Sequence, residues 1–385
     1  MLSKITSVPL LDTTRISDSC RNDLRATCER IIDSGQFILG PEVTSFEETM
    51  ASYLGVKHAI GVSSGTDALI LALMVLGVGP GDEVICPSFT FFATAGAIWR
   101  TGARPVFVDI DPASFNLAPD LLESVITDKT RAIMPVHLFG QMADMLAINA
   151  VAKKHSLPVI EDAAQAIGSK IDSAHAGTMG TMGAFSFFPT KNLGGYGDAG
   201  LVITDEETIA EKARILRVHG AQKRYFHQNV GGNFRIDALQ AGLIATRFKH
   251  LGTGADGRRA WAKDYDDAFH AAGVCEPGPS QLTLPPRTIG RHAFNQYTLR
   301  ASSESHRAHM LDHLKRENIG HSIYYPVPLH RQECFSELGY REGQLPHTEA
   351  ASRTVFSIPV FPQLTAAEHG RVTEVVVNAC RSFES

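Results

Sequence analysis

Between residues 58 and 203, short runs of β-forming residues alternate with helical or turn segments. The runs lie at about 58–62, 83–86, 104–109, 131–136, 158–161, 183–187 and 200–203. Strands separated in this way pair mostly in parallel, and helices cover both faces of their sheet. We therefore expect an α/β fold with a mostly parallel, seven-stranded sheet between helices. In such sheets ligands bind beyond the carboxyl ends of the strands, so the residues after each run are the first candidates for a site.

The length and composition of the chain predict two domains. Its 385 residues are 44% hydrophobic and 20% charged, which is typical of a soluble globular protein that is too long for one small core. We expect a large domain over residues 1–250, beginning with a helical segment, and a smaller C-terminal α/β domain over residues 251–385. The charged run 258–265 fits a connecting helix with salt-bridged sides. The Pro/Gly-rich stretch 277–290 marks a boundary or an insertion.

Charge, hydropathy and cysteine spacing exclude several classes of function. The net charge is -5 and the basic residues are scattered, so we expect no nucleic-acid partner. The N-terminus has no apolar signal core, and the longest apolar run, 68–78, is about half the length that spans a bilayer. We therefore expect a cytoplasmic protein without a membrane partner. The six cysteines lie far apart with no C-x-x-C pair, which indicates neither a metal site nor a disulfide framework.

Lys191 stands at an unusual place for a lysine. It follows the apolar, strand-like run 185–188 and precedes a loop rich in glycine. Burial at such a place lowers the pKa of an amine, and a neutral amine can attack a carbonyl to form a Schiff base. From this stretch alone, a lysine that caps a loop is an equally good interpretation.

A second candidate follows the first β-forming run. Ser64, Gly65 and Thr66 open an almost wholly apolar helix over residues 68–76. Glycine lets the backbone approach a ligand, and the free amides of a helix start favour an anion such as phosphate. An ordinary Ser/Thr helix cap is the alternative.

Aromatic and acidic residues follow two other runs. Phe89, Phe91 and Phe92 cluster after the second run, where one of them could stack on a flat ring or all could pack in the core. Glu161 and Asp162 end the fifth run, and a carboxylate at the end of a buried strand requires a cationic partner. A structural ion pair would also meet that requirement.

Together these motifs supply what one cofactor needs. Pyridoxal 5′-phosphate (PLP) requires a lysine for the Schiff base, an acid facing its pyridine nitrogen, a stacking aromatic ring and a phosphate cup at a helix start. The acid keeps the ring nitrogen protonated, so that the ring accepts electrons from the substrate carbon. Each pKa unit of such an effect corresponds to about 1.4 kcal/mol.

The chain resembles the DegT/DnrJ/StrS family of sugar-nucleotide aminotransferases, which belong to the fold type I PLP enzymes. The resemblance covers nearly the whole chain, and several long motifs occur in the family's order. Besides the motifs above, it rests on Val8-Pro9-Leu10-Leu11, residues 35–43, Arg217-Val218-His219-Gly220, residues 232–241, Asn295-Gln296-Tyr297 and residues 325–330.

The resemblance implies a role for each matching residue. Lys191 would form the Schiff base, and Asp162 would pair with the pyridine nitrogen. Gln165 would lie beside the ring near its phenolic oxygen. Phe91 would stack on the ring face, although the family often has another aromatic residue at stacking positions, which leaves the choice between Phe91 and Phe89 open. The phosphate would be held by Ser64, Gly65, Thr66 and Ser186.

The family also implies a shared active site. An asparagine at the position of Asn233 reaches the phosphate across a subunit boundary in the family, so the protein would be at least a homodimer.

The implied reaction has two halves: an amino donor, L-glutamate, gives its nitrogen to the cofactor, and a keto group of a nucleotide-linked sugar then receives it. Lys191 would also move the proton. Members of the fold with histidine instead of this lysine are sugar dehydratases, so Lys191 favours transamination.

The loop 219–227 looks more like that of members acting on 3-keto sugars, such as UDP-3-oxo-N-acetylglucosamine or a dTDP-3-keto sugar, in amino-sugar, lipopolysaccharide or glycan biosynthesis. An enzyme acting at C-4 is the alternative. Candidate contacts to the sugar or pyrophosphate, each equally consistent with a structural role, are Lys223, Arg224, Tyr225, Tyr324 and His330. A non-catalytic sugar-binding regulator on the same fold would not need Lys191, Asp162 and Ser186 together. A desulphurase would need a cysteine in a mobile loop, and no cysteine lies in a glycine- or serine-rich loop.

Overall fold

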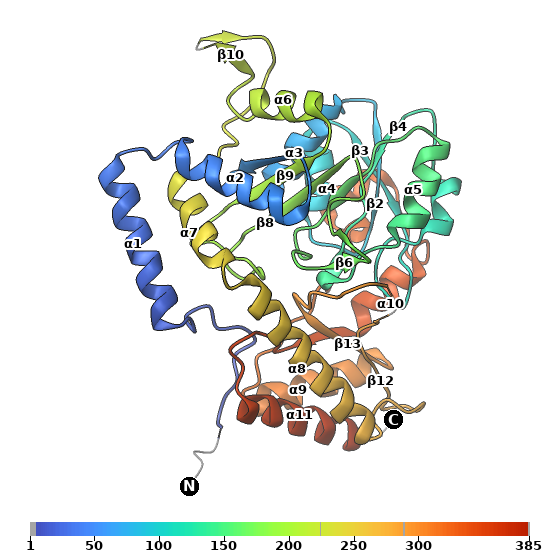
Figure 1. The fold of residues 1–385 in the computed structure, drawn as a ribbon. Coiled ribbons are helices and arrows are strands. Elements are labelled where there is room, and N and C mark those ends of the chain that lie inside the picture. The colour runs from blue at the N-terminus through green and yellow to red at the C-terminus, as the bar shows by residue number, and fades with distance from the viewer. Residues whose placement is uncertain (1–4, 224, 288, 384–385) are drawn as a thin grey trace.

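The computed structural model describes residues 5–223, 225–287 and 289–383 (Figure 1). The helices are α1 (Asp18–Ser34), α2 (Pro41–Leu54), α3 (Gly65–Leu76), α4 (Ala93–Arg100), α5 (Met145–Lys154), α6 (Glu207–Leu216), α7 (Ala238–Phe248), α8 (Leu251–Ala271), α9 (Glu304–Arg316), α10 (Pro346–Thr354) and α11 (Ala366–Arg381). The strands of the central sheet are β1 (His58–Val62), β2 (Glu83–Pro87), β3 (Arg104–Val108), β4 (Thr130–Ile133), β5 (Ile160–Asp162), β8 (Met182–Ser186) and β9 (Gly200–Thr204). The other strands are β6 (Lys170–Ile171), β7 (Ala174–His175), β10 (Ala221–Lys223), β11 (Phe226–His227), β12 (Leu282–Thr283), β13 (Tyr297–Ala301) and β14 (Val355–Ile358).

The central sheet is mostly parallel. One part has the strand order β3-β2-β4 and the other β1-β9-β8-β5. Parallel bridges from Ile133 to Val159 and from Val136 to Asp162 join the two parts between β4 and β5, giving one seven-stranded sheet within the described residues. Strand β9 is antiparallel to both of its neighbours, β1 and β8. The predicted α/β fold with a mostly parallel sheet is therefore confirmed.

Helices cover both faces of this sheet (Figure 1). On one face α2, α5 and α7 bury apolar residues in a core that includes Phe46, Ile148 and Ile244. On the other face α3, α4 and α6 pack in a second core around Leu71 and Ile98. Helix α3 is buried along most of its length, as its nearly continuous apolar sequence predicts.

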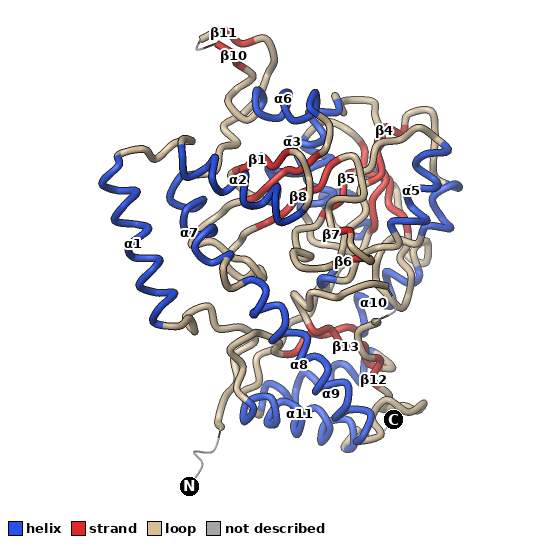
Figure 2. The backbone as a smooth tube through the Cα atoms, viewed as in Figure 1, coloured by secondary structure: helices blue, strands red, loops and turns tan. Residues whose placement is uncertain are grey.

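The C-terminal part of the chain has a core of its own. Helix α8 runs from the central sheet towards a three-stranded antiparallel sheet, β12-β13-β14 (Figures 1 and 2). Helices α8, α9 and α11 share an apolar cluster with that sheet, centred on Tyr265, Leu299 and Val376. This separate core fits two domains, whose exact boundary at residue 250 stays a prediction. None of the helices in the described ranges is long and apolar enough to cross a bilayer.

Candidate active site

The strand register brings the predicted site residues to one edge of the sheet. Gly200, at the start of β9, pairs with Val62 at the end of β1 and with Ser186 at the end of β8. Asp162 ends β5, which runs parallel to β8. The ends of β1, β5 and β8 therefore lie side by side. Ser64 follows β1, Asp162 is the last residue of β5, and Lys191 follows β8.

Lys191 lies in the loop that follows β8. Asn192 ties this loop to the C-terminal part of the chain, because its Nδ2 donates to the carbonyl of Ala293 at 2.9 Å and its Oδ1 accepts from Asn295 Nδ2 at 3.1 Å. Burial lowers the pKa of the Lys191 amine to about 8, and the negative charge of Asp162 opposes this shift only in part. The lysine is thus held in a surrounding where the neutral amine is accessible near neutral pH.

Asp162 is buried, with 5% of its surface exposed. Its Oδ2 accepts a hydrogen bond from Thr94 Oγ1 at 2.8 Å, and its Oδ1 accepts one from the backbone N–H of Ala164 at 3.2 Å. Burial raises the pKa of this carboxyl, while these hydrogen bonds and the charge of Lys191 counteract the rise. The positive charge that acts most strongly on this acid is that of Lys191.

His137 supports the acidic strand end, and the sequence interpretation missed it. His137 Nε2 lies 2.7 Å from Glu161 Oε2, and both side chains are completely buried. Because His137 Nδ1 accepts the N–H of Ala143 at 3.1 Å, the ring proton lies on Nε2 and is donated to Glu161. Glu161 also accepts backbone N–H groups of the turn 177–180. The histidine backbone N–H donates in turn to the carbonyl of Asp162 at 3.0 Å.

Gln165 is anchored by both ends of its amide. Its Oε1 accepts the N–H of Phe139 at 2.6 Å, and its Nε2 donates to the hydroxyl of Tyr325 at 3.1 Å. Burial raises the pKa of Tyr325 above its ordinary value, so this phenol stays protonated near neutral pH. These two hydrogen bonds fix the orientation of the Gln165 amide. Gln165 follows Asp162 by three residues in the chain.

Phe89 and Phe91 differ in what their rings can contact. Phe89 is 1% exposed and packs against Phe115 and Tyr325 in an apolar cluster. Phe91 is 57% exposed, and its ring centroid lies 6.2 Å from that of Tyr325. Of the two phenylalanines, Phe91 therefore has the ring face available to a ligand.

The helix start at α3 forms a close cradle with the end of β8. Ser64 caps the helix, accepting the N–H of Asp67 at 3.0 Å. A Cβ atom added to Gly65 would lie only 2.7 Å from Ser186 Cβ, so the backbone must approach this serine without a side chain. Thr66 lies in the first turn of the same helix. Ser64, Gly65, Thr66 and Ser186 thus meet at a helix N-terminus that can receive a phosphate.

Asn233 and the hairpin β10–β11 lie at the surface. Asn233 is exposed and forms an antiparallel bridge with Val218. Lys223 and Tyr225 are exposed on the hairpin, which projects from the rest of the molecule (Figure 1). Arg224, the remaining candidate in this loop, lies outside the described residues. No described residue of the hairpin lines either of the cavities that Thr190 lines.

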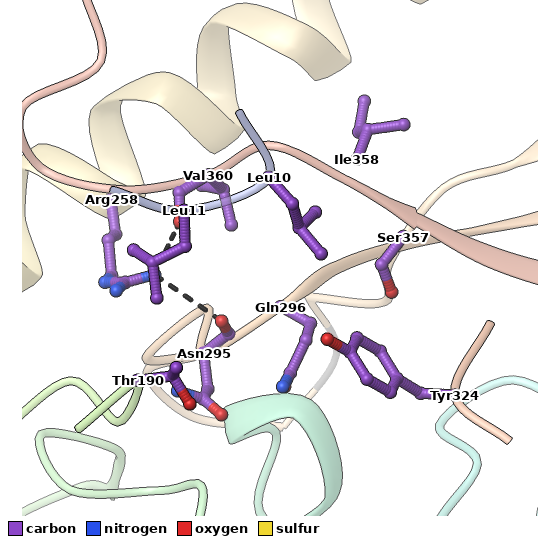
Figure 3. A pocket seen from close by; sticks show the side chains of 10 residues that line it. All are labelled: Leu10, Leu11, Thr190, Arg258, Asn295, Gln296, Tyr324, Ser357, Ile358 and Val360. Carbon is purple, nitrogen blue, oxygen red and sulfur yellow. Dashed lines mark hydrogen bonds between the residues drawn. The ribbon is translucent and has the colours of Figure 1, made fainter. Parts of the chain in front are cut away.

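Tyr324 and His330 occupy different surroundings. Tyr324 lines a cavity of about 250 Å³ together with Thr190 and Gln296 (Figure 3). His330 is 2% exposed, and its Nδ1 lies 2.7 Å from Ser88 Oγ. Its Nε2 lies 3.3 Å from a carboxylate oxygen of Glu349. Because both ring nitrogens have partners in the interior, the structural interpretation of His330 fits better than the substrate contact.

The residues at this sheet edge fit PLP. The neutral amine accessible at Lys191, the buried carboxylate of Asp162 and the Gly65–Ser186 cradle match the aldehyde, the pyridine nitrogen and the phosphate of that cofactor. The α/β fold and this set of groups define the class of PLP-dependent enzymes.

Comparisons with known proteins agree with this class. A model of the DegT/DnrJ/EryC1/StrS aminotransferase family matches residues 18–377. The chain is 45% identical over 379 residues to the pleiotropic regulatory protein of Geobacillus stearothermophilus, covering 98% of this chain and 100% of the relative. It is 40% identical over 376 residues to UDP-N-acetyl-3-dehydro-α-D-glucosamine 3-aminotransferase of Acidithiobacillus ferrooxidans, covering 97% and 98%.

A solved structure shows the same fold. The crystal structure of S. venezuelae DesV in complex with a ketimine intermediate matches with a TM-score of 0.92 and 38% identity, covering 98% of this chain and 100% of that chain. The chain therefore belongs to the DegT/DnrJ/EryC1/StrS aminotransferase family. The family resemblance, the enzyme class and the PLP dependence expected from the sequence are confirmed.

Proposed function

We propose that this protein moves an amino group from L-glutamate to the C-3 keto group of a nucleotide-linked sugar. The observation that carries the proposal is that Lys191, whose amine has a lowered pKa, follows β8, which lies beside β5 with the buried Asp162 at its end. Support for the carbon position comes from the Acidithiobacillus relative, whose name describes a 3-aminotransferase acting on a UDP-linked sugar. A UDP-3-oxo-N-acetylglucosamine type or a dTDP-3-keto sugar is the proposed acceptor, and a C-4 keto sugar is the alternative.

When bound, PLP supplies an aldehyde that condenses with amines and a ring that withdraws electrons from the attached carbon. Lys191 Nζ would hold the cofactor between turnovers and carry the proton to and from the reacting carbon once it is free. The Asp162 carboxylate would hold the proton on the pyridine nitrogen. Its hydrogen bond from Thr94 supports the ionised form.

The remaining residues would orient the cofactor. Gln165, fixed by Phe139 and Tyr325, would present its amide near the phenolic oxygen. Phe91 would stack on the ring with its exposed face. The phosphate would lie in the cradle formed by Ser64, Gly65, Thr66 and Ser186.

We also propose a homodimer with shared active sites. Asn233 would reach the phosphate in the partner's site, and Lys223 and Tyr225 would contact its substrate from the projecting hairpin. Apolar side chains gather on this surface: Phe226 is 61% exposed and Val230 is 90% exposed. Mixing Lys191→Ala with Asn233→Ala protein should restore part of the activity, because a mixed dimer contains one site with neither substitution. No recovery after proven subunit exchange contradicts shared sites.

The experiment that tests the function runs the second half-reaction backwards. PLP-loaded protein is mixed with UDP- and dTDP-linked 3-amino and 4-amino sugars, and the cofactor spectrum is followed. We expect a 3-amino sugar nucleotide to convert the cofactor fastest and Lys191→Ala to give no turnover. If no amino sugar converts the cofactor, the enzymatic proposal fails. A non-catalytic regulator that only binds a sugar would then be favoured; the Geobacillus relative is named a regulatory protein.

A further inference from the structure

Arg258 is a buried cation without an acidic partner. It lies on α8 and is 4% exposed. Its Nη1 donates to the backbone carbonyl of Phe294 at 3.2 Å. It also donates to the carbonyls of Asn295 at 3.4 Å and Val360 at 2.5 Å (Figure 3). In the described part of the chain, no carboxylate forms an ion pair with it. Burial lowers the pKa of the guanidinium to about 10, so it still carries its charge near neutral pH.

The bonding of Arg258 leaves one edge of its guanidinium unused. All of its hydrogen bonds to described residues start from Nη1, and Figure 3 shows the other two nitrogens turned away from the bonded carbonyls. Nε and Nη2 form the edge that binds a carboxylate through two parallel hydrogen bonds. A buried charge is costly without a counterion. An anion at this edge would supply one.

A cavity of about 410 Å³ lies beside this arginine. Arg258, Arg247 and Lys191 line it together, and its one acidic lining residue within the described ranges is Asp12. That carboxylate already accepts hydrogen bonds from Thr14 and Arg15. The cavity therefore has an excess of positive charge.

Arg247 is the second cation without an acid. Its Nη1 donates to the carbonyl of Gly194 at 2.6 Å, and its guanidinium lies 5.7 Å from the centre of the Tyr196 ring. The charge of Arg247 contributes to the lowered pKa of Arg258, which places the two guanidinium groups within electrostatic reach of each other. Two like charges near one cavity favour a ligand with two negative groups.

The cavity is linked directly to the reactive lysine. Thr190, the residue before Lys191, lines both this cavity and the one drawn in Figure 3. Asn295, whose carbonyl accepts from Arg258, also donates from its side chain to Asn192. An anion bound at Arg258 therefore lies next to the loop that carries the amine.

We propose that this cavity is the amino-donor subsite, in which the Nε–Nη2 edge of Arg258 binds one carboxylate of a dicarboxylic amino acid and Arg247 attracts the other. The assignment rests on the proposed function, since only an aminotransferase needs an amino donor. Two cations beside one amine fit glutamate or aspartate better than alanine, which has a single carboxylate. The diphosphate of a nucleotide sugar has the same charge, so the test must separate these two anions.

The test compares the two half-reactions in PLP-loaded wild-type protein, Arg258→Lys and Arg247→Gln. Arg258→Lys keeps the charge but loses the two-pronged edge. The half-saturating glutamate concentration, followed by the cofactor spectrum, should rise about tenfold or more in Arg258→Lys and about threefold in Arg247→Gln. The reverse reaction from the amino-sugar nucleotide should change less than about twofold. Calorimetric titration with glutarate, an unreactive dicarboxylate, should show weaker binding in both variants, and the weaker of the two in Arg258→Lys.

Arg307→Gln is the matched control. Arg307 is also a partly buried arginine that donates to a backbone carbonyl, that of Ser352, but it lines neither cavity. Its substitution should leave both half-reactions and glutarate binding as in the wild type. If Arg258→Lys does not fold, Arg247→Gln still tests the site, because Arg247 is less buried and donates a single hydrogen bond to the loop.

Two outcomes overturn the assignment. Unchanged glutamate saturation and glutarate binding in the folded variants would leave the arginines without a donor role. Weakening of the sugar-nucleotide reaction alone would assign the cavity to the diphosphate. Failure of the proposed function is distinguishable, because wild-type protein would then respond to no sugar nucleotide, while glutarate titration of the same variants still tests the two arginines.

Discussion

His137 and Glu161 form a completely buried hydrogen-bonded pair, with 2.7 Å between Nε2 and Oε2. The pair lies directly behind the acid of the active site, since Glu161 precedes Asp162 and the His137 N–H donates to the Asp162 carbonyl. Glu161 also holds the turn 177–180 through backbone N–H groups. One buried carboxylate thus fixes the strand end on which Asp162 is presented.

Glu161→Ala is expected to destabilise the fold strongly. The substitution leaves the Nε2–H of His137 and the amides of the turn 177–180 buried without an acceptor, which costs about 3 to 5 kcal/mol. Urea unfolding followed by circular dichroism measures the change in the free energy of unfolding. The matched control is Glu123→Ala, which removes the surface pairs with Lys154 and His155 and should cost less than about 1 kcal/mol. Equal effects of the two substitutions would contradict the role given to Glu161.

Thr94→Val should move the acid limb of the pH profile of kcat/KM to higher pH. The hydrogen bond from Thr94 lowers the pKa of Asp162, so its loss raises that pKa further above the ordinary value. Asp162 must be ionised to hold the proton on the cofactor, and a higher pKa protonates it at a higher pH. We expect the acid limb of kcat/KM to move up by about one pH unit, the size of one hydrogen bond to a charged group.

Thr94→Ser is the control for that experiment. Serine keeps the hydroxyl that donates to Asp162, so its acid limb should stay where the wild type has it. An unshifted limb in Thr94→Val would mean that the hydroxyl does not affect the ionisation of this acid.

The pKa of Lys191 predicts how cofactor uptake depends on pH. Schiff-base formation needs the neutral amine, and burial lowers the pKa of Lys191 to about 8. The rate at which cofactor-free protein takes up PLP should therefore rise with pH up to about 8 and level off above it. Stopped-flow absorbance measures this rate. A rise that continues towards the ordinary lysine value of 10.5 would contradict the lowered pKa.

The sequence allows a prediction for those site residues whose pattern is local. Lys191 and Asp162 each stand at the end of a β-forming run, and a parallel sheet brings such ends together. His137 could not be found in this way, because its acidic partner lies 24 residues away and a lone histidine after a strand has no distinctive pattern. The choice between Phe89 and Phe91 also required the structure, since the sequence does not show which of two nearby aromatic rings is buried.

The charged run on α8 shows a second limit of prediction from the sequence. Salt-bridged sides were expected, and Lys263 with Asp267 and Arg259 with Asp256 form such pairs. For Arg258 this expectation was wrong, because the segments around Phe294 and Val360 fold over that face of the helix and bury it. Helical periodicity indicates which residues share a face, but not which distant segment covers that face.

Gly65→Ala should weaken phosphate binding more than it weakens the fold. The added Cβ would meet Ser186 Cβ at 2.7 Å and Cα at 3.2 Å, so the helix start must move away from the end of β8. Such overpacking costs about 1 to 3 kcal/mol of folding stability. Because the same movement opens the cradle, PLP affinity measured by fluorescence titration should fall about tenfold or more.

Gly77→Ala, at the other end of α3, is the matched control. Its φ of +76° makes alanine strained there, yet no atom lies within 4 Å of the added Cβ and the cradle is not involved. A comparable loss of PLP affinity in both variants would show that destabilisation of α3, rather than the contact between Gly65 and Ser186, controls cofactor binding.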